Sequence, residues 1–448
     1  MNNLLKSTRS TMQVAAMALG IAAAAPLQAQ VTVNVLPTSD WVWLAPQHPV
    51  IEMTVRDSLL HALSTDITLR ITTDTHQPVS TMTQHVTVAQ GDSANLCFDP
   101  GITQPGFYSA EVLADGKTAY HVGVQHNADV KPTARFTFGY EPEHITSLPD
   151  YPADFKAYWD EARAQLAAID PQYKMTELTD KSSDSKKFYR VSMLSWGGDT
   201  IQAYLTIPTK KSKVRVSNKI AKGKYPVHIL YMGYNSDVWD LSTADDGWIQ
   251  LLLCVRGQAL NKPTNRYGDW VQYGLDDAKG YYYRGAYMDC VRAIDFVCTL
   301  PEADQRNIFA EGGSQGGAFT MAAAALDDRL CAVAPYITFM SDFPDYFQIV
   351  HWPYEAIHKK QLELHMTDEA VLHTMSYVDI KNLARWINCP VMLGCGLQDP
   401  TCPPHTNFSG YNLVAAPKEY IIFRTRGHDV DYSIWSPRCI EWFKKWIR

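Results

Sequence analysis

The 448-residue sequence lacks the patterns that mark cofactor-dependent proteins. No strand-like run is followed by Gly-x-Gly-x-x-Gly or by a P-loop, so no nucleotide cofactor is expected. No Cys-x-x-Cys pair or cysteine–histidine cluster is present, so no metal site is expected either. The 40 basic and 47 acidic residues leave a net charge of −7, which gives no indication of nucleic-acid binding.

Apolar runs long enough to cross a membrane are also missing. A shorter run lies at the N-terminus, where Lys6 and Arg9 precede the Ala-rich stretch 14–25 and small residues follow up to Ala29. This order is typical of a signal peptide, and no cysteine lies near its end to accept a lipid anchor. We therefore expect residues 1–29 to be removed. The remaining protein is expected to be periplasmic or secreted, without stable membrane insertion.

A disulfide framework is not evident among the nine cysteines, although export permits disulfides. Four of them lie in apolar runs and are expected to be buried free thiols: Cys254, Cys298, Cys331 and Cys395. Cys389 and Cys402 flank a strand-like run, so a disulfide between these two is an alternative to free thiols.

The rest of the chain divides into regions of different pattern. Residues 30–130 hold short runs in which apolar and polar residues alternate, separated by turns, and this pattern predicts an all-β sandwich of the Ig-like kind. Residues 131–150 hold three prolines and few apolar residues, which predicts a linker. Residues 151–448 begin with an amphipathic helix and then alternate apolar strands with helices. This predicts a mostly parallel sheet with helices on both faces.

The stretch Gly312-Gly313-Ser314-Gln315-Gly316 lies between a strand-like run and a stretch of strong helix formers. Strand, sharp turn and helix is the setting of a nucleophile elbow, where the serine of Gly-x-Ser-x-Gly is raised at the top of a sheet. The glycines allow the strained turn, and the helix N-terminus can stabilise an oxyanion. Ser314 is therefore the candidate nucleophile of an α/β-hydrolase fold; the alternative is an ordinary glycine-rich turn.

Two further residues follow apolar strand-like runs in the chain order of that fold, which is serine, acid, histidine. Asp399 and His428 each leave the carboxyl end of such a run, where ligands bind in open α/β sheets. We assign His428 as the base that activates Ser314, and Asp399 as the acid that orients it. Asp429 and Asp431 are rivals for the acid, but they lie too close to His428 in the sequence to reach its Nδ1 easily.

An oxyanion hole in this fold uses two backbone N–H groups. One belongs to the residue after the nucleophile, which is Gln315 here. The other comes from the loop after an earlier strand, and Tyr234 in the stretch Gly233-Tyr234 occupies that place. The role needs only backbone groups, so a simple glycine turn is compatible with it.

Several stretches together resemble carbohydrate esterase family 7, the acetyl xylan esterases and cephalosporin-C deacetylases. They are Gly233-Tyr234, Arg256-Gly257-Gln258, Tyr281-Tyr282-Tyr283-Arg284-Gly285, Gly312-Gly313-Ser314-Gln315-Gly316-Gly317, and Leu397 and Asp399 with Pro403-Pro404. The resemblance covers about residues 151–448. One departure is His428-Asp429, where the family usually has His-Glu.

This resemblance implies a serine esterase that needs no cofactor and removes acetyl groups from acetylated sugars through Ser314, His428 and Asp399. It also implies a supporting role beside the site for Arg256, Gly257 and Gln258. The charge of Arg256 would be paired with a buried carboxylate or, alternatively, with one at the surface. Family members form ring-like hexamers, so homo-oligomers are implied, but the added N-terminal region is expected to block or alter that packing.

Other interpretations stay open. A serine peptidase of the prolyl-oligopeptidase type has a similar fold and triad, but neither a propeller nor a substrate-binding glutamate pair is evident. A catalytically silent carbohydrate-binding protein would use residues 30–130 as its working part, although that region can equally be a spacer or an interface. The aromatic-rich segment 336–365 is either a cap that narrows the acyl pocket to acetyl groups or part of the core.

Overall fold

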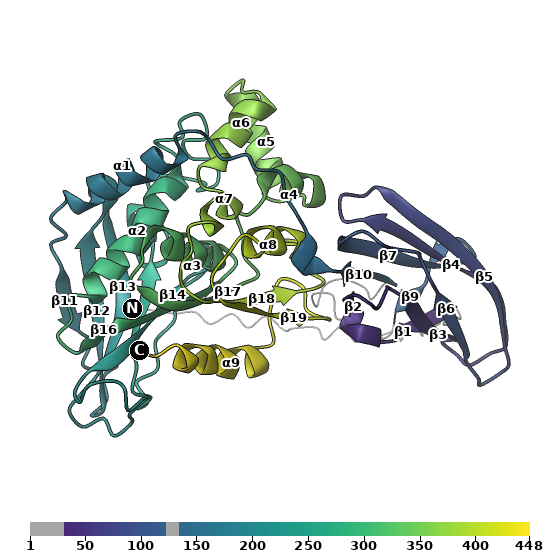
Figure 1. Ribbon diagram of the computed structural model, residues 1–448, viewed down its shortest axis with the longest axis horizontal. Helices are drawn as coiled ribbons and strands as arrows, with labels where there is room; N and C mark the ends of the chain where they lie inside the picture. The colour runs from purple at the N-terminus through teal and green to yellow at the C-terminus, as the bar shows by residue number, and fades with distance from the viewer. Residues whose placement is uncertain (1–30, 122–133) are drawn as a thin grey trace, which may run out of the picture.

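The computed structural model describes residues 31–121 and 134–448, which form a larger and a smaller lobe (Figure 1). The predicted signal peptide, residues 1–29, lies outside the described residues. Within the described ranges, no helix combines the length and the apolar character needed to cross a membrane.

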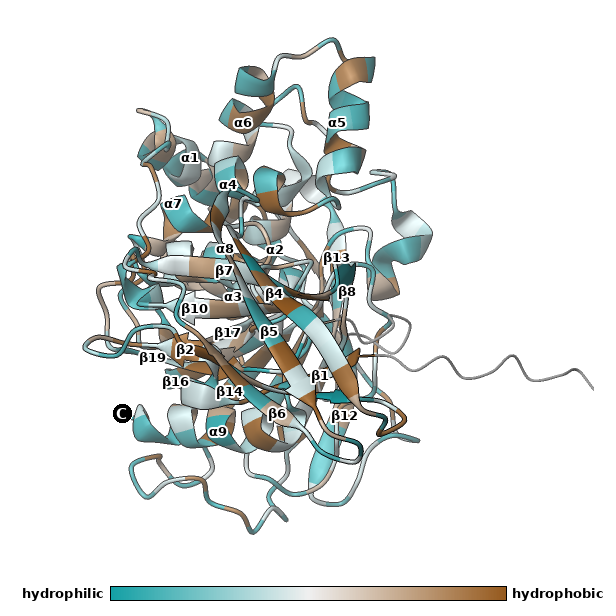
Figure 2. Cartoon of the chain, turned by 90° about the vertical axis from the view of Figure 1, so that its right-hand side faces the viewer, coloured by the Kyte–Doolittle hydropathy of each residue, from teal (hydrophilic) through white to brown (hydrophobic). Residues whose placement is uncertain are grey.

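Two β-sheets make up the smaller lobe. Their strands are β1 (Val31–Val35), β2 (Val42–Trp43), β3 (Ile51–Asp57), β4 (Leu63–Thr73), β5 (Pro78–Val88), β6 (Ala94–Phe98), β7 (Gly106–Ala114), β8 (Lys117–Thr118), β9 (Tyr120–His121) and β10 (Arg135–Tyr140). One sheet has the order β6-β3-β1-β9, and the other has the order β2-β10-β7-β4-β5 with β8 beside β7. Hydrophobic and hydrophilic residues alternate along β4 and β5 (Figure 2), so each strand turns one apolar row inward.

Strand β10 differs from the sequence expectation, which placed residues 131–150 in a linker. It pairs antiparallel with β7, with Phe136 opposite Ala110 and Phe138 opposite Tyr108. Both phenylalanines are buried in the core of the smaller lobe. Prolines and sparse apolar residues suggested a linker, but two phenylalanines at alternate positions suffice to give a strand one apolar face.

The larger lobe is built on a nine-stranded sheet with the order β11-β12-β13-β15-β14-β16-β17-β18-β19. These strands are β11 (Lys174–Glu177), β12 (Lys186–Leu194), β13 (Thr200–Pro208), β14 (Tyr225–Tyr231), β15 (Ile249–Cys254), β16 (Ala303–Gly313), β17 (Leu330–Tyr336), β18 (Val391–Gly396) and β19 (Lys418–Phe423). The six strands from β15 to β19 in this order are parallel to one another. Strands β11, β12 and β13 are antiparallel to their neighbours.

Helices cover both faces of this sheet (Figure 1). They are α1 (Phe155–Ala167), α2 (Tyr282–Val297), α3 (Gln315–Leu326), α4 (Phe343–Ile349), α5 (Tyr354–Glu363), α6 (Asp368–Ser376), α7 (Ile380–Ala384), α8 (Pro404–Tyr411) and α9 (Tyr432–Lys445). Helix α9 lies on the opposite face from α2, α3 and α8, and α3 is buried along its whole length. The predicted fold class, an α/β-hydrolase fold behind an all-β region, is confirmed.

Where the two lobes meet, they share one hydrophobic cluster. Side chains of β18, of the residue after it and of α8 pack into the core of the smaller lobe: Leu393, Cys395, Leu397, Phe408 and Tyr411. The rings of Phe107 on β7 and Phe408 on α8 lie 5.7 Å apart. Because Asp399 lies in the loop between β18 and α8, the smaller lobe packs directly beside the candidate active site.

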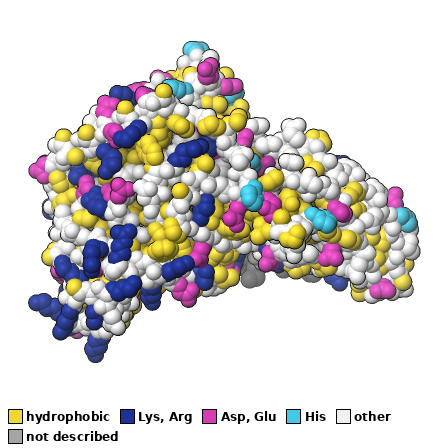
Figure 3. Space-filling model, viewed as in Figure 1, with side chains coloured by type: hydrophobic (Ala, Val, Ile, Leu, Met, Phe, Trp, Pro, Cys, Tyr) yellow, Lys and Arg dark blue, Asp and Glu magenta, His cyan; other side chains and the backbone are white. Residues whose placement is uncertain are grey.

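A partly buried ion pair joins the lobes beside this cluster. His405 at the start of α8 lies 2.8 Å from Asp74 of the smaller lobe and 3.3 Å from Asp345 of α4. Histidine and acidic side chains are visible together where the lobes meet (Figure 3). Burial lowers the pKa of His405, but hydrogen bonds to Asp345 and Asp74 outweigh this effect and raise the pKa to about 10.

This pair predicts pH-dependent stability. A histidine with a raised pKa stabilises the fold fully below its unfolded pKa of about 6.5, and this contribution is lost as the pH rises through about 10. His405→Gln should therefore lower the free energy of unfolding by about 2–4 kcal/mol at pH 6, less than the roughly 3–5 kcal/mol lost when a fully buried ion pair is broken, because this pair is partly exposed. Urea unfolding between pH 6 and pH 10.5 measures the difference.

The matched control is His85→Gln, because His85 also contacts an aspartate at 2.8 Å but both partners are exposed. That variant should change stability little at any pH. A deficit of His405→Gln that is equally large at pH 6 and pH 10.5 would contradict the assignment of a charged His405.

Candidate active site

The turn at Ser314 joins β16 to α3 through a strained backbone. Ser314 has a φ of 57° and a ψ of −120°, a conformation rare for a residue with a side chain. Its N–H donates to the carbonyl of Tyr336 at 3.0 Å, and its carbonyl accepts from the N–H of Phe339 at 3.1 Å. A Cβ atom at Gly316 would clash with the carbonyl oxygen of Tyr231, so glycine is required there.

Ser314, His428 and Asp399 form one continuous chain of contacts. His428 Nε2 lies 3.0 Å from Ser314 Oγ, and His428 Nδ1 lies 2.8 Å from Asp399 Oδ2. The other carboxylate oxygen of Asp399 accepts the N–H groups of Thr401 and Cys402 at 2.8 and 2.9 Å. The side chain of Asp399 is fully buried, so these bonds hold the carboxylate where it can orient the imidazole.

The rival carboxylates lie elsewhere. Asp429 is about half exposed and lies 3.8 Å from Arg426. Asp431 pairs with Arg426 at 2.9 Å and caps α9 by accepting the N–H of Ser433. Both carboxylates therefore have partners other than His428.

The loop after β14 lies beside the elbow because β14 and β16 are neighbours, with Tyr231 opposite Gly312. Tyr234 lies in this loop, and Gln315 is the first residue of α3. In the described part of the chain, neither backbone N–H donates to another protein group. Both groups are thus free to donate to a ligand.

Gln258 joins the two segments that carry these N–H groups. It forms a reciprocal pair of amide hydrogen bonds with Gln315, at 3.0 and 3.1 Å. Its Oε1 also accepts the N–H of Asn235, the residue after Tyr234, at 3.2 Å. Gln258 and Gln315 are buried, so this network fixes the loop relative to the start of α3.

Arg256 is paired with a buried carboxylate, the first of the two predicted alternatives. Its Nε and Nη2 donate to the two oxygens of Asp289 at 2.9 and 2.7 Å, and Nη1 lies 3.0 Å from Asp199. Although burial opposes it, the charge of Asp289 raises the pKa of Arg256. Gly257 follows with a φ of 70°, where a Cβ atom would clash with Asn265. The sequence offered no pattern to identify Asp289 as the partner.

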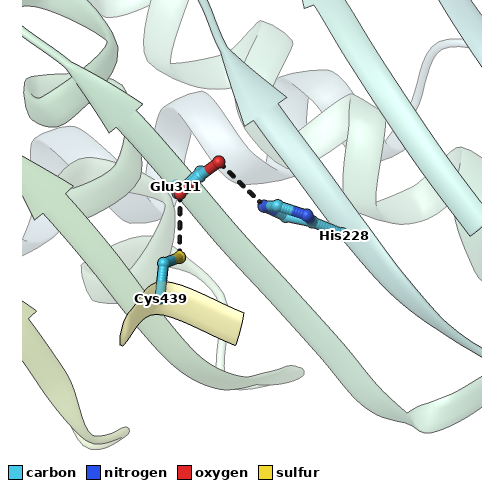
Figure 4. Close-up of side chains that lie close together, drawn as sticks. All are labelled: His228, Glu311 and Cys439. Atoms are coloured by element: carbon cyan, nitrogen blue, oxygen red, sulfur yellow. Dashed lines mark hydrogen bonds and ion pairs between the residues drawn. The ribbon is translucent and has the colours of Figure 1, made fainter. Parts of the chain in front are cut away.

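A second buried cluster, which no sequence pattern indicated, lies on the nucleophile strand (Figure 4). Glu311 of β16 lies 3.3 Å from His228 Nε2 of β14 and accepts the thiol of Cys439 of α9 at 2.8 Å. Although burial opposes it, His228 lowers the pKa of Glu311. The contact between sulfur and oxygen is shorter than the separation of roughly 3.3–3.8 Å between ligands of one zinc ion, given the usual bond lengths. We therefore interpret the cluster as a hydrogen-bonded support for the strand that ends at Ser314.

Two more groups of potential metal ligands occur among the described residues, and both have other roles. Asp399, Cys402 and His428 surround the serine site, and Asp342, Asp345 and His405 belong to the contact between the lobes. All nine cysteines are free thiols, so Cys389 and Cys402 are not paired.

The aromatic segment after β17 contributes to both the core and the site. Phe339, Phe343 and Tyr346 are buried, as the core interpretation predicts. Trp352, between α4 and α5, is 40% exposed, stacks on Phe339 at 5.7 Å and meets the ring of Tyr234 at 5.3 Å. Trp352 therefore borders the loop that carries the Tyr234 N–H, as the cap interpretation predicts.

The Gln258 network predicts a selective loss of turnover. Gln258→Ala frees both N–H-bearing segments without touching Ser314 or His428, so kcat should fall about 10- to 100-fold while KM changes little. Steady-state kinetics on a short acetyl ester measure both constants.

Gln361→Ala is the matched control, because Gln361 is a buried glutamine that bonds Asp368 and His358 away from the site. It should reduce stability and leave kcat nearly unchanged. Equal losses of kcat in the two variants would show that Gln258 acts only through stability.

Comparisons with known proteins identify the family. The family model described as acetyl xylan esterase (AXE1) matches residues 143–446. The acetyl esterase Axe7A of Xylanibacter ruminicola is 30% identical over 344 residues, which cover 72% of this chain and 71% of that protein.

Solved structures show the same relation. The acetyl xylan esterase from Paenibacillus sp. R4 is 28% identical, has a TM-score of 0.62, and is matched over 68% of this chain and 99% of its own. Acetyl xylan esterase 1 from Thermoanaerobacterium sp. JW/SL YS485 shares the fold at 24% identity and a TM-score of 0.61, over 69% of this chain and 98% of its own. The family match begins after the last strand of the smaller lobe. The chain belongs to the acetyl xylan esterase family and is a carboxylic ester hydrolase.

Proposed function

We propose that this protein is an exported serine esterase that removes acetyl groups from acetylated sugars, such as acetyl xylan or acetylated xylo-oligosaccharides. The observation that carries the proposal is the contact chain from Ser314 through His428 to Asp399 in a member of this family. The proposed export rests on the signal-like residues 1–29.

In the first half of the reaction, Ser314 Oγ attacks the acetyl carbonyl carbon while His428 Nε2 takes the serine proton. Asp399 accepts the Nδ1–H of His428 and stabilises the imidazolium that forms. The bond between the acetyl carbon and the sugar oxygen then breaks. His428 returns the proton to the sugar oxygen, and the acetyl group stays on Ser314.

In the second half, water replaces the sugar. His428 takes a proton from the water, whose oxygen attacks the acetyl carbon. The bond to Ser314 Oγ then breaks, acetate leaves, and His428 returns the proton to Ser314. In each half, the N–H groups of Tyr234 and Gln315 stabilise the negative oxygen of the tetrahedral intermediate.

The acyl side of the site is proposed to favour small groups. The rings of Trp352 and Tyr234 contact each other beside the turn at Ser314, and the buried ring of Phe339 stacks on Trp352. We propose that these rings leave room beside Ser314 for a methyl group more readily than for a longer acyl chain.

The triad assignment is tested by three substitutions. Ser314→Ala and Asp399→Asn should each lower kcat for acetate release by about 10³-fold or more, because each removes a member of the triad. Asp429→Asn should stay within a few-fold of the wild type, because Asp429 faces Arg426. Acetate release from acetylated xylan and from a short acetyl ester is the measurement.

Full activity of Ser314→Ala, or equal losses in Asp399→Asn and Asp429→Asn, would overturn this assignment. A short peptide amide is included as a further substrate. Faster cleavage of the amide than of the acetyl esters would favour a peptidase instead.

A further inference from the structure

A cleft of about 600 Å³ lies between the two lobes, next to the candidate active site. Figure 3 shows the surface hollowed where the lobes meet. Asp399, Pro400 and Gly427 line it from the larger lobe, together with residues 349–351 after α4. Trp352, the next residue, contacts Tyr234, so the same loop borders both the cleft and the site.

The other wall of the cleft is the outer face of the sheet formed by β4, β7 and β10. Strand register places its polar side chains in two rows across the three strands. The rows are Thr72, Ser109 and Thr137, and Arg70, Glu111 and Arg135. The face therefore presents hydroxyl groups next to the larger lobe and paired charges beyond them.

Glu111 lies between the two arginines of its row and pairs with both. Glu111 accepts Arg135 Nη2 at 2.6 Å and Arg70 Nη1 at 3.3 Å. Flat guanidinium and carboxylate groups held in this way can bond ring hydroxyls, while the hydroxyl row can both donate and accept. Such a surface suits a neutral chain with many hydroxyls better than a polyanion, which would meet Glu111 and Asp74 in the same cleft.

Gln398 aligns this face with the site. Its Oε1 accepts the N–H of Thr137 at 2.7 Å, and its Nε2 donates to the carbonyl of Thr137 at 2.9 Å. The next residue is Asp399, whose carboxylate orients His428. A sugar chain bound on the hydroxyl row would therefore lie at a set distance from the reacting serine.

We propose that the smaller lobe supplies a sugar-chain subsite, in which the Thr72 and Arg70 rows bind unreacted xylose units beside the acetylated one. This rests on the proposed esterase function and extends it to a preference for acetylated oligosaccharides or polymer over small acetyl esters. The cleft volume falls within the range of about 300–1,000 Å³ that is typical of small-ligand sites, which is room for a short oligosaccharide.

The test replaces both hydroxyls of one cross-strand pair, Thr72→Ile with Ser109→Ile. The control is the cross-strand pair Thr68→Ile with Thr83→Ile, which lies on the same two-sheet lobe and outside the cleft. Isoleucine suits strands, so both double variants should fold. For each protein, kcat/KM is measured on acetylated xylo-oligosaccharides of increasing length and on p-nitrophenyl acetate.

The wild type should show kcat/KM rising with oligosaccharide length. In the Thr72/Ser109 variant, the ratio of kcat/KM on the longest oligosaccharide to that on p-nitrophenyl acetate should fall about 10-fold, mainly through KM. The ratio of the control should stay within two-fold of the wild type. Unacetylated xylo-oligosaccharide should bind Ser314→Ala in calorimetry and bind it more weakly when Thr72 and Ser109 are also replaced.

Failure of this proposal differs from failure of the esterase assignment. Activity on p-nitrophenyl acetate with no dependence on chain length, or an unchanged ratio in the variant, would overturn the subsite alone. A Thr72/Ser109 variant that changes its sedimentation but not its ratio would make the cleft a contact between copies, and would also overturn it. No acetate release by the wild type from any ester would contradict the esterase itself.

Discussion

The strained turn at Ser314 is the constraint on which the rest of the site depends. A backbone in this region costs about 1–3 kcal/mol, and it persists only where the surroundings hold it. Here β14 and β17 flank β16, the strand that leads into the turn. Backbone groups of Tyr336 and Phe339 form hydrogen bonds with the backbone of Ser314. Within β16, Glu311 contacts His228 and Cys439. The parallel order of the sheet then brings the loops that carry Asp399 and His428 to the same edge.

The sequence was enough to predict residues that lie at the ends of strands and follow the chain order of the fold. Ser314 lies in a motif with its own turn geometry, and Asp399 and His428 each follow a buried strand, so parallel pairing alone brings them together. Their roles in catalysis remain a proposal. Arg256 was predicted to have a carboxylate partner, but not which one, because Asp289 lies on a helix 33 residues away.

Features that depend on packing between distant segments were not predictable. Strand β10 lies among prolines and few apolar residues, and its pairing with β7 and β2, which are distant in the sequence, completes it as a strand. The start of helix α2 at Tyr282 depends on tertiary packing, because the tyrosines of its first turn are buried against the core. The contacts of Gln398 with Thr137 and of His405 with Asp74 join the two lobes across hundreds of residues, so no local pattern marks them. These same contacts set the smaller lobe beside Asp399 and give the cleft its second wall.

If Ser314 is the nucleophile, it carries the acetyl group during turnover. This expectation is tested most directly by mixing the enzyme with an acetyl ester, quenching with acid within milliseconds, and mapping the modified peptide by mass spectrometry. We expect an acetyl group on Ser314 that disappears as the ester is consumed. Turnover with no acetylated intermediate at any time, or with the acetyl group on another residue, would contradict it.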